Sequence, residues 1–176
     1  MLLDLRNLGL SFALLVTAAT SAAEWSYSQK APDLLGKIEN YAVGSDSGGL
    51  GGLLVIRCVG NDTLELALLE PSTASQIGAA AKLVGETTRM FVRVDNSPVQ
   101  SFDNATVGVW NRNAIGVVIE GRTPELLQLV RSIGTAKSKI AVGVELGSGY
   151  VVTKTFGANG STAAVNAVTK ACQLDH

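Results

Sequence analysis

The chain has 176 residues, a net charge of −1 and only 16% charged residues, together with 19 glycines. A chain of this length fits one domain. The near-neutral charge argues against a nucleic-acid-binding surface, and few charges with many glycines suit a compact, sheet-rich extracellular or periplasmic domain better than a disordered one.

The N-terminal segment has the organisation of a secretory signal peptide. Arg6 lies in a short polar start, an apolar run covers residues 8–19, and small residues end at Ala23. The alternative is a retained N-terminal membrane anchor, for which the apolar run is short. We therefore expect cleavage of residues 1–23, a periplasmic location, a single domain over residues 24–176 and no stable membrane span after cleavage.

Two short patterns precede a glycine-rich connection. Segments 24–27 and 34–45 suggest one or two strands, with Tyr41 among their apolar anchors. The sequence GSDSGGLGG (44–52) is too rich in glycine for regular structure, so it predicts a flexible connection.

Alternating apolar residues over 53–69 predict a β-hairpin. Its strands cover residues 53–59 and 63–69, and the polar sequence VGND forms the turn. The residues expected on one face are Leu54, Ile56, Cys58, Leu64, Leu66 and Leu68. Arg57 faces the opposite side of the first strand.

The middle of the chain predicts further strands. Residues 71–85 fit either a short helix or a loop. A strand over 87–95 has Met90, Val92 and Val94 on its inner face. The remaining predicted strands are VQSF (99–102) and ATVGVWN (105–111) around a turn at 103–104, and AIGVVIE (114–120).

Two amphipathic helices and two strands complete the prediction. Thr123 caps a helix over 123–133, in which Pro124 is the first residue. Strands follow at 139–146 and 150–156. Ser161 is expected to cap a second helix over 161–173. The apolar stripes of the helices are Leu126, Leu129, Val130 and Ile133, and Val165, Val168 and Cys172.

The chain has two cysteines, Cys58 and Cys172. In an exported chain the simplest arrangement is one disulfide, and the alternative is two free buried thiols. Both cysteines lie on predicted apolar faces. A bond between them would therefore attach the C-terminal helix to the sheet.

Several motifs occur in an order that resembles the VasI/TagO family, small exported proteins associated with type VI secretion. Trp25 follows the signal segment, and a glycine-rich loop precedes an apolar strand that ends in Arg57 and Cys58. The later motifs are NDTLELAL, FVRVD, PELLQLVRSI, IAVGVEL and TFGANGSTAAVNAVTKAC. The resemblance implies an association with type VI secretion and a partner among envelope or secretion-system proteins.

The sequence offers little support for catalysis. Its one histidine, His176, is the last residue, and terminal residues are poor general bases or metal ligands. No thiol nucleophile remains if both cysteines are bonded. The acid pairs Asp62 with Glu65 and Glu120 with Glu125 fit solvated turn residues. We therefore expect no catalytic residue, no metal and no cofactor.

Arg57, Arg93 and Asp95 are the candidate binding residues. Both arginines lie opposite the predicted apolar faces, and Asp95 ends the second of these strands. If the two strands are neighbours, Arg57 and Asp95 form a cross-strand pair. The alternatives are a site for an anionic ligand and a structural ion pair or solvated strand face.

The prediction is thus an α+β domain with an antiparallel-rich sheet of about six to eight strands. Two amphipathic helices cover one face, and one disulfide links them to the sheet. The expected function is that of a non-enzymatic, periplasmic accessory or interaction protein. The alternatives are a binding module for a small anionic or envelope-derived ligand, and an inhibitor or immunity protein.

Overall fold

The structure is a computed structural model, and it describes residues 24–30, 39–48, 51–59, 63–110, 113–145, 149 and 151–174. The predicted signal segment (1–23), the turn residues 60–62 and His176 lie outside the described residues. Among the described residues, no helix is long and apolar enough to cross a membrane.

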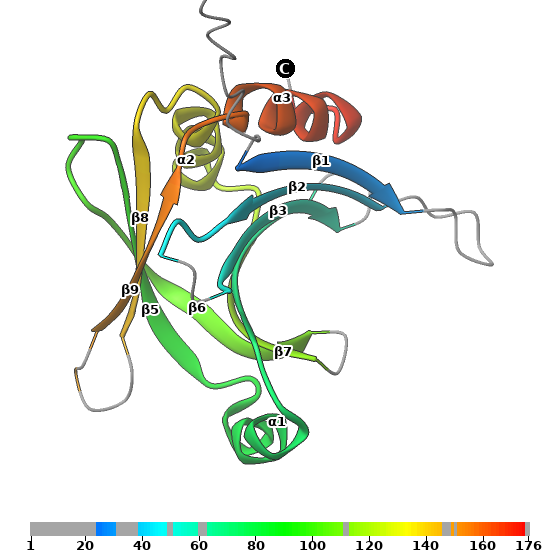
Figure 1. Ribbon diagram of the computed structural model, residues 1–176, viewed down its shortest axis with the longest axis vertical. Helices are drawn as coiled ribbons and strands as arrows, with labels where there is room; N and C mark the ends of the chain where they lie inside the picture. Colours follow the sequence, from blue (N-terminus) through cyan, green and yellow to red (C-terminus); the bar gives the residue numbers. More distant parts are fainter. Residues whose placement is uncertain are drawn as a thin grey trace, which may run out of the picture.

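In its described residues the structure combines one antiparallel sheet with three α-helices, which is an α+β fold and confirms the predicted class (Figure 1). The strands are β1 (Trp25–Lys30), β2 (Glu39–Ser45), β3 (Leu53–Val59), β4 (Thr63–Pro71), β5 (Thr87–Val94), β6 (Gln100–Trp110), β7 (Ala114–Gly121), β8 (Lys139–Glu145) and β9 (Val151–Gly157). The helices are α1 (Ala74–Ala80), a 3₁₀ turn (Ala81–Leu83), α2 (Pro124–Gly134) and α3 (Ser161–Ala171).

The strands form one sheet in the order β1-β2-β3-β4-β7-β6-β5-β8-β9, with every neighbouring pair antiparallel. Nine strands exceed the six to eight expected. The sheet curls so that the residues after β2 reach β9: Asp46 bridges Phe156, and the Ser47 amide donates to the Thr155 carbonyl at 2.9 Å. The result is a partly closed barrel.

The core fills the inner side of this curled sheet. It is built from alternate strand residues and from the apolar stripes of α2 and α3, as the periodicity predicts. Both helices lie at one end of the barrel, and α1 lies at the other (Figure 1). The largest fully buried side chains include Leu54, Ile56, Leu64, Met90 and Phe156.

The disulfide between Cys58 and Cys172 is present, as predicted. It joins β3 to the C-terminal end of α3, with a Cα–Cα distance of 5.9 Å. Trp25 ties β1, which packs beside α3, to the last residue of β9: its indole N–H donates to the Gly157 carbonyl at 2.7 Å. The ring lies where a Cβ on Gly44 would stand, 2.5 Å from Trp25 Cε2, so only glycine fits there.

Two local predictions need correction, and one segment that the sequence left open is settled. The predicted strands 99–102 and 105–111 are one strand, β6, because a bulge absorbs the polar residues at 103–104 instead of a turn. The ambiguous segment 71–85 contains α1, whose first turn has a capping box of Thr73 and Gln76. Ser161 is not the cap of α3: Gly160 holds that position with φ 88°, and Ser161 is buried as the first helical residue.

Candidate functional site

Arg57 lies on the outer side of the sheet, opposite the barrel core. In the β3–β4 register it faces Glu65, and its Nη2 donates to Glu65 Oε2 at 2.8 Å. The predicted pair with Asp95 does not form, because β4, β7 and β6 separate β3 from β5. The Glu65 side chain is only 5% exposed, so this is an ion pair largely removed from water.

Trp110 covers this ion pair. The Arg57 guanidinium carbon lies 3.8 Å from the centroid of the Trp110 ring, which is a cation–π contact. Trp110 comes from the last residue of β6, where it pairs with Ala114. The sheet is strongly curved (Figure 1), and the Trp110–Arg57 contact joins β6 to β3 although β4 and β7 lie between them in the sheet.

Beside Trp110 the outer side of the sheet has a hollow of about 400 Å³. Its lining residues are Tyr41, Val43, Leu53, Val55, Leu69, Pro71, Trp110, Asn113 and Ala114. We call this site the outer hollow. Val55, Ala67 and Leu69 form a second buried apolar cluster beneath it, separate from the barrel core. Two aromatic side chains over an apolar floor are typical of a binding pocket.

Burial changes the acid–base behaviour of two groups near this site. Burial raises the pKa of Glu65, and the hydrogen bond and charge of Arg57 oppose that shift. Burial, aided by the hydrogen bond to Glu39, raises the pKa of Tyr41 to about 12. The Tyr41 hydroxyl is therefore a neutral donor near pH 7 and has no tendency to act as a base.

Two polar atoms of the ion pair lack partners within the described part of the chain. Glu65 Oε1 and Arg57 Nε are buried and make no hydrogen bond. Buried polar groups usually have partners, so unpaired ones mark sites where a water or ligand atom fits. These two atoms are not part of the lining of the outer hollow; Trp110, which contacts Arg57 and also lines the hollow, connects the two features.

Arg93 lies elsewhere, on the outer side of β5, where it is exposed. It borders a shallow hollow of about 370 Å³ whose apolar lining includes Phe91, Val99 and Val151. In the described residues it forms no ion pair. Arg57 and Arg93, which were both predicted as candidate binding residues, therefore lie at separate places on the outer side of the sheet.

Asp95 has a structural position at the end of β5. With φ 51° it turns the chain, and its carboxylate accepts the backbone amides of Lys137, Ser138 and Lys139 at 2.8–3.0 Å. The Ser138 hydroxyl donates to it as well, at 2.7 Å. These bonds to the charged form hold the pKa of Asp95 well below its usual range. Asp95 thereby secures the connection between α2 and β8.

Replacement of Asp95 by alanine should loosen that connection without unfolding the barrel. We expect faster amide hydrogen exchange at residues 137–139 and a lower melting temperature, with exchange in β3 unchanged. Because the folded pKa is depressed, the contribution of Asp95 is present above its unfolded pKa and is lost as the pH falls through the folded value. Unchanged exchange at 137–139 near pH 7 would contradict this role.

Of the acid pairs considered from the sequence, Asp62 lies outside the described residues, whereas Glu120 and Glu125 both line a hollow of about 340 Å³. Glu65 and Glu120 are register partners on β4 and β7, but Glu65 is already bonded to Arg57. No group of three or more metal-ligating side chains comes together in the described ranges. The sequence did not identify Trp110 as a site residue, because the side of the sheet on which Trp110 lies became apparent only when residues 100–110 proved to form one strand.

No family model, no curated protein and no solved structure matches this chain.

Proposed function

We propose that the protein is an exported, non-enzymatic binding protein whose outer hollow receives a side chain of a partner protein. The single observation that supports this is the aromatic-walled outer hollow, one wall of which is Trp110 stacked on the Arg57–Glu65 pair. Tryptophan, tyrosine and arginine are the residues that most often dominate protein–protein binding energy, in well-packed pockets from which water is excluded. Tyr41, Trp110 and Arg57 meet in such a place.

Export rests on two features of the chain. The disulfide is stable in an oxidising compartment, such as the bacterial periplasm. The N-terminal signal pattern would direct the chain there, with cleavage after Ala23. The resemblance to the VasI/TagO family adds an association with type VI secretion. The partner is then another envelope or secretion-system protein.

A second candidate function is binding of a small anionic ligand, and Arg93 favours it more than Arg57. Arg57 already donates to Glu65 and is stacked on Trp110, whereas Arg93 is exposed beside an apolar hollow. The inhibitor alternative would be supported by a protruding loop such as 44–52 or 96–105. Since β6 begins at Gln100, little of the second segment remains outside the sheet, and residues 49–50 of the first lie outside the described residues.

Site-specific photo-crosslinking in cells that export the protein tests the proposal. A crosslinking residue at Asn113, on the rim of the outer hollow, should give a discrete protein adduct. Addition of Trp110→Ala should reduce its yield at least about tenfold, as expected for loss of a dominant contact.

The matched control places the same crosslinker at Val151, which is 41% exposed on the rim of the Arg93 hollow. Val151 should give no adduct of the same mass. Melting of the Trp110→Ala variant checks that the fold is retained. Equal adducts from both positions, or an adduct from Asn113 that persists without Trp110, would rule out the outer hollow as the binding site.

A further inference from the structure

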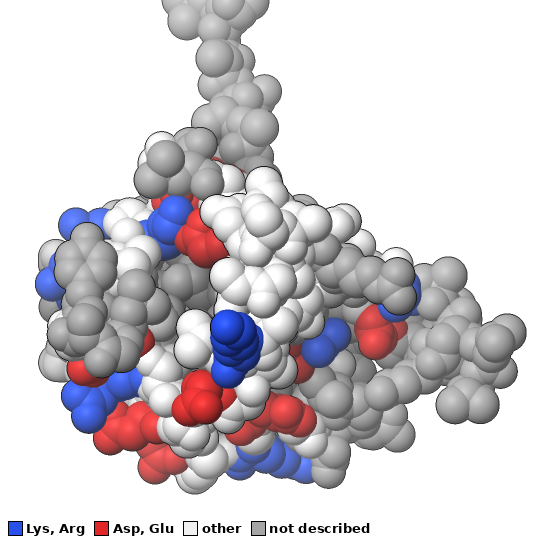
Figure 2. Space-filling view, turned by 90° about the horizontal axis from the view of Figure 1, so that it is seen from below, with Lys and Arg blue, Asp and Glu red and all other residues white. Residues whose placement is uncertain are grey.

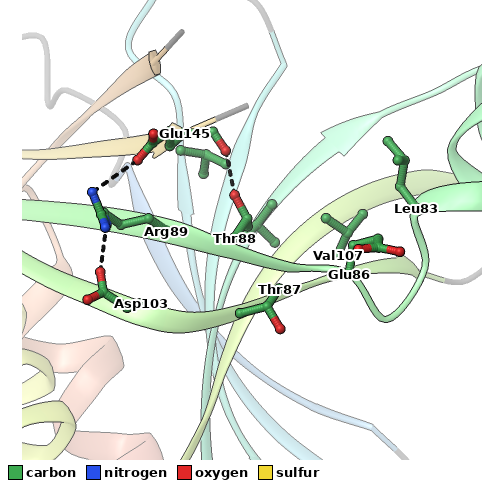
Figure 3. A pocket seen from close by; sticks show the side chains of 10 residues that line it. Leu83, Glu86, Thr87, Thr88, Arg89, Asp103, Val107 and Glu145 are labelled. Carbon is green, nitrogen blue, oxygen red and sulfur yellow. Dashed lines mark hydrogen bonds and ion pairs between the residues drawn. The ribbon is translucent and has the colours of Figure 1, made fainter. Parts of the chain in front are cut away.

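Besides the outer hollow and the hollow beside Arg93, the barrel has a cavity at the end that carries α1. Its volume is about 480 Å³, and β5, β6, β7 and β8 surround it together with the 3₁₀ turn (Figure 3). Val107, Val117 and Val144 line it, and their strand positions place them on the inner side of the sheet. We call it the mouth cavity, because it opens the barrel interior to solvent.

A strand irregularity borders this opening. The β5–β6 register shifts between Thr88 and Met90, so β6 carries one extra residue near Asp103. Bulges of this kind re-aim side chains at barrel rims and often lie beside functional sites. Beyond the bulge, the amide and carbonyl of Val107 bond to Glu86 and Gly85 at 3.0 and 2.9 Å, so the rim itself is well ordered.

The rim is apolar on the side of the 3₁₀ turn. Leu83 is 54% exposed and the following residue, Val84, is 51% exposed. Figure 2 views this end of the molecule and shows acidic and basic side chains mixed around an uncharged surface. Large apolar side chains left open to water beside an apolar cavity are typical of ligand entrances.

Charges at the rim determine the sign of a suitable ligand. Arg89 contacts Asp103 at 2.6 Å and Glu145 at 3.3 Å, so its single positive charge is shared between two carboxylates (Figure 3). Glu86 also lines the cavity and forms no ion pair within the described ranges. Three carboxylates and one guanidinium therefore line the cavity, and the excess is negative.

Hydrogen bonds keep this arrangement in place. The Thr88 hydroxyl donates to the backbone carbonyl of Glu145, which ties the end of β8 to β5. Arg89, on the outer side of β5, bridges β8 and β6 through its ion pairs with Glu145 and Asp103. The charged wall is thus held by contacts between strands, and Glu86 is the carboxylate left available to a ligand.

We infer that the mouth cavity binds a small amphiphile with an apolar body and a cationic, ammonium-type head. The body occupies the space among Val107, Val117 and Val144, where it loses contact with water. The head lies at the rim beside Glu86, where the excess of carboxylates favours a cation and disfavours an anion. This site is independent of the outer hollow.

Methyl-resolved NMR titration with three probes tests the inference. Octylammonium should shift the methyl resonances of the three cavity valines saturably at millimolar concentration. Octanoate, of the same chain length, should bind at least about tenfold more weakly, and neutral octanol should lie between them. The outer hollow should be unaffected, so Val43, Val55 and Leu69 methyls serve as internal references.

Two substitutions complete the test. Glu86→Gln should weaken octylammonium by about three- to tenfold and bring its affinity close to that of octanol. Glu125→Gln, an exposed acid at the start of α2, should leave the affinity unchanged. Equal binding of octanoate and octylammonium, shifts confined to other surfaces, or no shift at the cavity valines at 10 mM probe (about 10 mM being the weakest affinity expected of an eight-carbon ligand) would overturn the inference.

Discussion

Replacement of Cys58 and Cys172 by alanine should lower the free energy of unfolding by about 4–5 kcal/mol. The two cysteines are separated by 114 positions, so the bond closes most of the domain into one loop in the unfolded chain. Loss of the bond restores the conformational freedom of that loop. Urea unfolding of the wild type and the double variant, followed by circular dichroism, measures the difference.

Reduction provides the control for this experiment. Wild-type protein treated with a thiol reductant should approach the stability of the double variant, whereas the reductant should leave the variant unchanged. The bond also attaches α3 to β3, so amide exchange in α3 should increase first. Equal unfolding midpoints with and without the bond would show that packing alone holds the helix.

Arg57→Met should lower the free energy of unfolding by about 3–5 kcal/mol near pH 7, because it leaves the Glu65 carboxylate buried without its partner. Methionine keeps an apolar stem against Trp110, so packing changes little. Urea unfolding at several pH values measures the effect. Arg93→Met, at an exposed position, is the matched control and should be nearly neutral.

The pH dependence identifies Glu65 as the cause. Burial raises the folded pKa of Glu65 above its ordinary value of 4.5, and loss of Arg57 raises it further. A raised carboxyl pKa means that the folded state binds the proton more tightly than the unfolded state does. The ionised Glu65 carboxylate therefore destabilises the folded state above the folded pKa, and this destabilisation disappears as the pH falls toward the unfolded pKa. The variant should therefore recover much of its stability near pH 5.

A second substitution separates this electrostatic cause from packing. Addition of Glu65→Leu to Arg57→Met should restore most of the lost stability at pH 7, since no buried charge remains. A loss that is equally large near pH 5, or that persists in the double variant, would mean that Arg57 acts mainly through its contact with Trp110.

Much of the fold could be predicted from residue periodicity. The inward faces of β3, β4 and β5 follow from strict alternation, and the start of α2 follows from Thr123 and Pro124. The disulfide followed from two apolar positions in a chain with a signal pattern. These features depend on neighbours in the sequence, so local rules are sufficient for them.

The candidate sites could not be predicted in the same way. The sequence DN at 103–104 is typical of a turn, yet it lies in a bulge of β6, because pairing with both β5 and β7 outweighs the local preference. That bulge places Asp103 in the lining of the mouth cavity. It also makes residues 100–110 a single strand, whose last residue, Trp110, reaches Arg57.

Strand order also lies beyond local patterns. Asp95 cannot pair with Arg57 because β4, β7 and β6 lie between β3 and β5, and Arg57 bonds instead to Glu65 across the β3–β4 hairpin. Lys154 is another case: alternation within β9 directs it inward beside Phe156, where an unpaired ammonium would be costly. Glu70 of β4 lies 3.0 Å away and compensates its charge.

The sequence by itself determined most of the strands, the amphipathic helices α2 and α3, which of their faces are apolar, and that both cysteines lie on such faces. Each of these depends on spacing along a few residues, where period and capping have direct physical causes. Only the tertiary structure decided which charges meet, where the sheet bends, and where cavities remain. Those properties arise from strand order and curvature, which bring together residues such as Arg57 and Trp110 that are far apart in the chain.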